Sequence, residues 1–253
     1  MTTAVERGVE YLLRHQHLDG TWSSANANPM YRVAITSLAA RSLHLWARKL
    51  KPELGERART ASEKATMWLN KEVKLVEPES FNSFGAAYVV DYFIDLEETK
   101  ATVRGDVKTA VHLLQAGQME NGAWSYTYPE PRSFNQKPEY SIGRASLCEH
   151  VLQRLTANDE KDLEESIQLF MTHRAELRPV VKLTEGWMSK VGSSSYFYFY
   201  AYEHAARAIV YQGNEIKERL AILRDDLLKV SEADGSWVDF EAIGKPYGTA
   251  MAL

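Results

Sequence analysis

Two aspartates one helical turn apart are the first candidates for chemistry in this chain. Asp91 and Asp95 are separated by four residues, which places both carboxylates on one face of a helix. Carboxylate oxygens at this spacing can hold Mg²⁺ and, through it, a diphosphate group. The alternative is a solvated pair at a helix end, because Asp95 begins the acidic run that ends at Glu98. Asp91 is therefore a candidate catalytic residue, and Mg²⁺ is the one cofactor that the sequence suggests.

Two glutamates in apolar segments are the other candidate catalytic residues. Glu149 and Glu203 occupy positions where an unpaired charge would be costly to bury. One interpretation places them on the polar floor of a ligand pocket, where either could act as an acid. The structural alternative is an ion pair, because Arg144 or Arg207 could neutralise one of them.

The sequence predicts no metal site built from cysteine and histidine. Cys148 is the only cysteine, and His150 follows it by two residues. Two such positions on a helix point about 200° apart, so the side chains cannot readily share a metal ion.

An aromatic run from Tyr196 to Tyr202 is the richest local feature of the chain. Its alternation is typical of a strand, but the alanines that follow, up to Ala208, favour a helix. On a helix beside a cavity, the rings could accommodate an apolar ligand or a carbocation. The predicted ligand-contacting residues are Tyr88, Tyr92, Tyr196, Tyr198, Tyr200 and His204. The alternative for all six is ordinary core packing.

Helices must position these side chains, because apolar residues recur at spacings of three and four through nearly the whole chain. We expect helices over Thr2–Gln16, Tyr31–Leu50, Glu56–Val73, Phe81–Leu96, Arg104–Gln118, Glu139–Thr156, Lys161–Glu176, Ser194–Gln212 and Glu215–Ser231, and a further one from Tyr247. Candidate N-caps are Ser80, Ser141 and Ser194. The stretch from Tyr126 to Pro138 is the longest expected loop.

Internal repetition organises these helices. The first copy ends in Gln16, Gly20 and Trp22, the second in Gln118, Gly122 and Trp124, and the third in Ser231, Gly235 and Trp237. The helices around Trp68 and Leu169 could be degenerate copies, which gives one helical hairpin per about fifty residues. A hairpin of this size cannot bury its apolar face alone, so the copies must stack and curve towards a barrel.

The first copy resembles a known motif. Arg7-Gly8, Tyr11-Leu12, Gln16, Gly20 and Trp22 resemble the QW motif of squalene and other triterpene cyclases. The ending from Tyr247 to Leu253 is similar to inner-helix starts in the same superfamily, that of terpenoid cyclases and protein prenyltransferases. The resemblance covers essentially the whole chain. It implies an all-α fold, an α/α toroid of about five hairpins, in which the glutamine and tryptophan side chains tie the scaffold together.

The resemblance implies the fold but no particular activity, because the superfamily's catalytic signatures are absent. The chain contains neither the Asp-x-Asp-Asp sequence of class II cyclases nor the aspartate, cysteine and histidine that bind zinc in protein prenyltransferases. Two hypotheses follow. The first is a diverged terpenoid cyclase-like protein that binds an isoprenoid-type ligand, with or without catalysis. The second is a non-catalytic protein-binding or scaffold module.

Composition limits the partners further. A formal net charge of -4 with dispersed basic residues predicts no nucleic-acid partner. Charges interrupt every apolar segment, so we expect no transmembrane helix. One cysteine and the lack of a signal-like start predict a cytoplasmic protein. We expect one domain over 1–253, whose last inner helix is cut short at Leu253, and an unclosed barrel could leave apolar surface for a homodimer.

Overall fold

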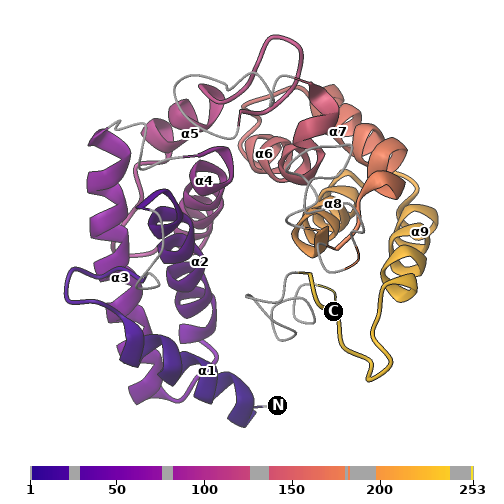
Figure 1. Cartoon of the computed structure of the whole chain (residues 1–253). Helices are drawn as coiled ribbons and strands as arrows, with labels where there is room; N and C mark the ends of the chain where they lie inside the picture. Colours follow the sequence, from indigo (N-terminus) through magenta and orange to yellow (C-terminus); the bar gives the residue numbers. More distant parts are fainter. Residues whose placement is uncertain are drawn as a thin grey trace. The chain divides into compact units, whose positions relative to one another are not determined.

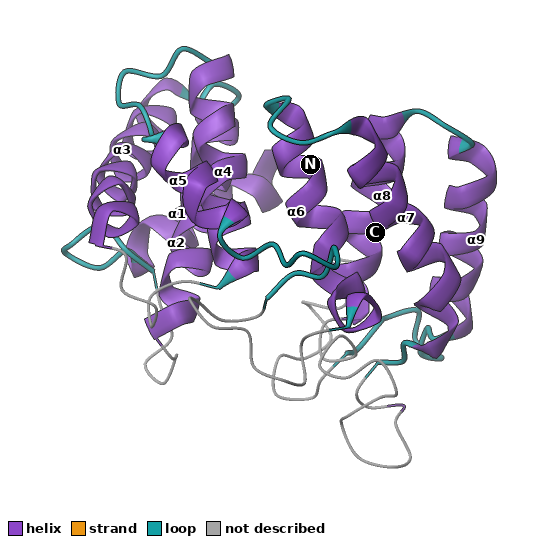
Figure 2. Ribbon diagram, turned by 90° about the horizontal axis from the view of Figure 1, so that it is seen from above, coloured by secondary structure: helices purple, strands orange, loops and turns teal. Residues whose placement is uncertain are grey.

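The computed structural model describes residues 2–22, 29–75, 82–125, 137–179, 182, 198–239 and 252. All secondary-structure elements with named bounds in these ranges are helices (Figure 2), which confirms the predicted all-α class. No helix in the described part of the chain has the length and apolar character needed to cross a membrane.

The chain divides into two compact units. The first, to Gly117, contains α1 (Thr2–His15), α2 (Pro29–Ala47), α3 (Pro52–Leu75), α4 (Ser83–Glu98) and α5 (Val107–Gln115). Within it α2 packs against α3 and α4, α1 packs against α3, and α4 packs against α5 (Figure 1). The second helices of the two hairpins α1–α2 and α3–α4 are thus neighbours, as stacking of hairpins predicts.

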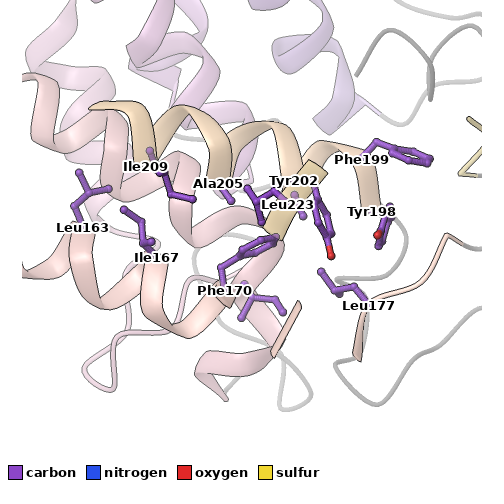
Figure 3. Close-up of a cluster of buried hydrophobic side chains, with 13 residues drawn as sticks. Leu163, Ile167, Phe170, Leu177, Tyr198, Phe199, Tyr202, Ala205, Ile209 and Leu223 are labelled. Atoms are coloured by element: carbon purple, nitrogen blue, oxygen red, sulfur yellow. The ribbon is translucent and has the colours of Figure 1, made fainter. Parts of the chain in front are cut away.

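The second unit begins at Gln118 and has the same kind of packing. It contains η2 (Pro138–Ser141), α6 (Ile142–Arg154), α7 (Glu160–His173), η3 (Arg174–Glu176), α8 (Tyr198–Gln212) and α9 (Ile216–Lys229). Helix α8 packs against α6, α7 and α9. Figure 3 shows Leu163, Ile167 and Phe170 of α7 facing Ile209, Ala205 and Tyr202 of α8 in a buried apolar cluster.

All nine predicted full-length helices are present, but some of their ends differ from the prediction. Asn82 caps α4 in place of the predicted Ser80, because its side-chain oxygen accepts a hydrogen bond from the Gly85 N–H at 2.7 Å. The Ser141 hydroxyl donates to the Pro138 carbonyl at 2.8 Å and does not cap α6 through its side chain. Other predicted features fall outside the described residues: Ser80, Ser194, most of the Tyr126–Pro138 loop and nearly all of the helix expected from Tyr247.

The three repeat copies end in the same turn, which confirms the internal repetition. In the first copy the His17 N–H donates to Thr21 and the Gly20 N–H to the His17 carbonyl. The second and third copies form the same pair of bonds, between 119, 122 and 123 and between 232, 235 and 236. In each copy an Asp or Asn side chain also accepts the N–H two residues later. Gly20, Gly122 and Gly235 all adopt positive φ, at 95°, 79° and 79°.

This shared geometry predicts unequal costs for one substitution in the three turns. Replacing Gly122 or Gly235 by alanine should cost about 1–2 kcal/mol from the left-handed backbone alone, since a Cβ there meets nothing within 4 Å. Gly20→Ala should cost more, because its Cβ would come 2.9 Å from the Lys64 carbonyl oxygen on α3. Urea unfolding of the three variants measures the difference, and equal losses would contradict the close approach of this turn to α3.

Candidate functional site

Glu149 is the candidate acid with the most constrained surroundings. It lies on α6 and is only 3% exposed. Its Oε1 accepts hydrogen bonds from the Trp124 indole N–H at 2.8 Å and the Gln118 side-chain amide at 3.1 Å. Its Oε2 accepts one from the Asn158 amide at 2.7 Å. One carboxylate therefore holds the turn of the second repeat copy and the α6–α7 connection onto the same helix.

Two kinds of effect shift the pKa of Glu149 in opposite directions. Burial disfavours the charged carboxylate and raises its pKa above the ordinary value, and the negative charge of Asp162 on α7 acts in the same direction. The hydrogen bonds from Asn158, Trp124 and Gln118 lower the pKa, but burial prevails. Burial and the charge of Glu149 also raise the pKa of the neighbouring Cys148 thiol well above its usual range, so this cysteine is an unreactive core residue.

One of the predicted arginine–glutamate pairs, Arg207 with Glu203, is present in the structure. Arg207 Nη1 lies 3.9 Å from Glu203 Oε1, one turn earlier on α8. Arg144 instead donates from Nε and Nη2 to the Trp124 carbonyl, at 2.9 and 2.6 Å. Arg144 and Glu149 therefore bind opposite ends of the same tryptophan, the backbone and the indole, and both fix the turn against α6.

The aspartate pair is buried in the first unit, so the expectation that Asp95 is solvated is wrong. Asp91 is fully buried and Asp95 is 5% exposed. The cause is Arg41 on α2, which sits 3.1 Å from an Asp91 oxygen and 2.5 Å from an Asp95 oxygen. A guanidinium that contacts both carboxylates supplies the positive charge that Mg²⁺ would have supplied. The pair joins α2 to α4.

Tyr92, predicted to contact a ligand, contacts the neighbouring helix α3. Its hydroxyl lies 2.6 Å from the Ser62 hydroxyl and 2.8 Å from the Thr66 hydroxyl. Burial raises its pKa to about 12, so the phenol stays neutral. Tyr88, one turn earlier on α4, is also buried. The polar end of Tyr92 is thus engaged within the first unit.

The described part of the aromatic run, from Tyr198, forms the start of α8, as predicted for a helix, and its members divide between two faces. Tyr198 and Tyr202 belong to the buried cluster with Phe170 and Leu177 (Figure 3). Their ring centroids are 4.5 Å apart, and burial raises the pKa of both phenols. The Tyr202 hydroxyl donates to Asp226 on α9 at 3.3 Å. These two rings act in core packing.

The other face of α8 carries the remaining candidates. The rings of Tyr200 and His204 meet edge to face, with centroids 4.4 Å apart, and both residues are buried. His204 Nδ1 lies 2.8 Å from the Glu203 carboxylate, which is about one-third exposed. Tyr196 lies outside the described residues. In the second unit the structure thus groups Tyr200, Glu203 and His204 along one helix, whereas Asp91 belongs to the first unit.

The residues that sequence reasoning missed are the partners of the candidate acids. Arg41 and Asn158 carry no local signal, because each meets its carboxylate only after two helices have packed or a connection has folded back. Among the described residues, no group of three or more His, Cys, Asp or Glu side chains could hold a metal ion.

Comparison of the chain with known proteins finds no relative. No family model matches the chain, and neither a curated protein nor a solved structure is significantly similar to it. The resemblance to terpenoid cyclases therefore rests on the repeat residues and the sequence from Tyr247 to Leu253.

Proposed function

We propose that this chain is a non-catalytic scaffold or protein-binding module built from stacked helical hairpins of the α/α-toroid kind. The observation that carries this proposal is the coordination of Glu149 by three N–H donors from the turn and the α6–α7 connection. A general acid must offer its proton to a substrate. The carboxylate of Glu149 acts instead as an acceptor for the surrounding chain.

The other candidate acids support the same proposal. Arg41 contacts Asp91 and Asp95, and Arg207 and His204 lie beside Glu203. Burying the two aspartates without such a partner would be costly, and Glu203 is partly exposed, so each group has a structural reason for its position. In a module of this kind, the packed hairpins present a surface and the buried charges fix their register.

A second candidate function is a diverged isoprenoid-binding or cyclase-like activity. The specific observation in its favour is the pKa of Glu149, which burial raises in the direction that a general acid requires. Tyr200 and His204 on α8 would be the ring contacts for such a ligand. Mg²⁺ enters this candidate only through Asp91, whose contact with Arg41 weighs against it.

Two further expectations belong to the proposal. Stacked hairpins can leave apolar surface that a second copy could cover, which predicts a particle of twice the 28.7 kDa of one chain in light scattering. A cytoplasmic location fits the single cysteine, which is buried.

The deciding experiment compares Glu149→Gln with Glu149→Ala. Glutamine keeps an oxygen that can accept from Trp124 and Gln118, and the Asn158 amide can turn its own oxygen towards the new amide, but glutamine cannot donate a proton as an acid. Alanine leaves three donors without their acceptor, which should cost about 2–3 kcal/mol. We expect Glu149→Gln to unfold at or above the urea midpoint of the wild type and Glu149→Ala well below it.

The same proteins test the second candidate. Native mass spectrometry is run with farnesyl diphosphate, geranylgeranyl diphosphate and squalene, with and without Mg²⁺, and the products are extracted and analysed. We expect no retained polyprenyl species and no hydrocarbon product from any of the three proteins. A product made by the wild type and lost in the folded Glu149→Gln variant would identify Glu149 as an acid and overturn the scaffold proposal.

A further inference from the structure

The contacts of Glu149 have a consequence that does not depend on what the chain binds. Its Oε2 faces the side-chain amide of Asn158, a group that can present either an N–H donor or, after rotation, a carbonyl acceptor. Its Oε1 can accept from Trp124 and Gln118 whether or not the other oxygen carries a proton. Both oxygens of the carboxyl group can therefore keep a hydrogen-bond partner in either protonation state, and rotation of the Asn158 amide gives up only its 3.2 Å bond to the Glu149 backbone carbonyl.

We infer that Glu149 and Asn158 form a proton-operated latch that holds the turn at 118–124 and the α6–α7 connection onto α6 more tightly in acid. With the proton bound, the carboxyl group is neutral, and the Asn158 oxygen can accept its O–H. Without the proton, a negative charge with no cation among its hydrogen-bond partners must remain buried, which favours opening of the turn and entry of water.

The direction of the pH dependence follows from the linkage between proton binding and folding. Because burial raises the pKa of Glu149 in the folded protein, the folded chain binds this proton more tightly than the unfolded chain does. The contribution of Glu149 to stability therefore falls as pH rises from the ordinary value of 4.5 through the raised pKa, and it is constant above that. Of the neighbouring charges, that of Asp162 on α7 acts on Glu149. The elements packed around Glu149 also carry Arg144, Cys148, His150 and Arg154 on α6, Asp159 in the α6–α7 connection, Glu160, Lys161, Glu164, Glu165 and His173 on α7, Glu120 in the turn, and Glu203, His204 and Arg207 on α8.

The repeat itself supplies matched controls. Trp22 and Trp237 occupy the positions of Trp124 in the other two copies, but their indole N–H groups donate to the backbone carbonyls of Leu12 and Leu227, each at 2.8 Å. A backbone carbonyl does not titrate. The indole N–H signals of the ¹⁵N-labelled full chain, assigned through Trp→Phe variants, report each tryptophan separately.

We expect the Trp124 indole signal to titrate with a midpoint above pH 4.5 and its N–H to exchange faster with water on the alkaline side, relative to Trp22 and Trp237. Glu149→Gln should remove that titration and keep the slow exchange at all pH values. Asn158→Ala removes a donor to the carboxylate and should move the midpoint to higher pH. A Trp124 signal that is independent of pH, or that titrates equally in Glu149→Gln, would overturn the latch.

Discussion

Arg41→Ala should destabilise the first unit by about 3–5 kcal/mol. The substitution removes the guanidinium that contacts both Asp91 and Asp95 and leaves two buried carboxylates one helical turn apart without it. Removing one partner of a buried ion pair costs this much because the remaining charge is uncompensated. Here the two remaining charges also repel each other.

The matched control lies directly after helix α2, which ends at Ala47. Arg48 donates to the Thr99 carbonyl but is exposed, so Arg48→Ala should change stability by less than about 1 kcal/mol. Hydrogen exchange with mass spectrometry localises the loss, which should appear in α2 and α4 and spare α8. Adding Asp91→Asn and Asp95→Asn to Arg41→Ala should restore much of the lost stability. If Mg²⁺ stabilises the wild-type protein and not these variants, the aspartates bind metal and the ion-pair interpretation fails.

The helices and their repetition could be predicted from the sequence because both signals are local. Apolar periodicity marks each helix, and a glycine with an Asp or Asn before it marks each repeat turn, since the left-handed backbone at Gly20, Gly122 and Gly235 favours that residue. The caps were harder. Ser80 and Asn82 are both good N-caps, and only the packed helix distinguishes them.

The hydrogen-bond and ion-pair partners of the acidic residues could not be predicted, because they depend on how distant parts of the chain pack together. The sequence indicates that Glu149 lies in an apolar segment, but its donors come from a turn some thirty residues earlier and from the next connection. Arg41 is 54 residues from Asp95, so the sequence near the aspartates does not indicate that they are buried beside an arginine. Long-range pairing of polar groups depends on which helix faces pack together. The apolar periodicity predicts each helix but does not predict its neighbours.

Trp124→Ala should be the most damaging substitution in the second unit, at about 3–5 kcal/mol. The indole is fully buried, its N–H donates to Glu149, and its backbone carbonyl accepts two bonds from Arg144. Alanine removes the ring and leaves a cavity, and it also takes one donor from a carboxylate that is already costly to bury. Trp124→Phe keeps most of the ring and should lose only about 1 kcal/mol, the value of one hydrogen bond.

The third repeat copy provides the comparison that separates the ring from its acceptor. Trp237 is half-buried and donates to a backbone carbonyl, so Trp237→Ala should cost about half as much as Trp124→Ala. Circular dichroism during urea unfolding measures both losses without relying on tryptophan fluorescence. The difference between the two variants should narrow in the Glu149→Gln background, because a neutral amide tolerates the loss of one donor better than a buried carboxylate does. A difference that is unchanged in that background would mean that the tryptophan stabilises the turn through packing alone, and that Glu149 is held mainly by Gln118 and Asn158.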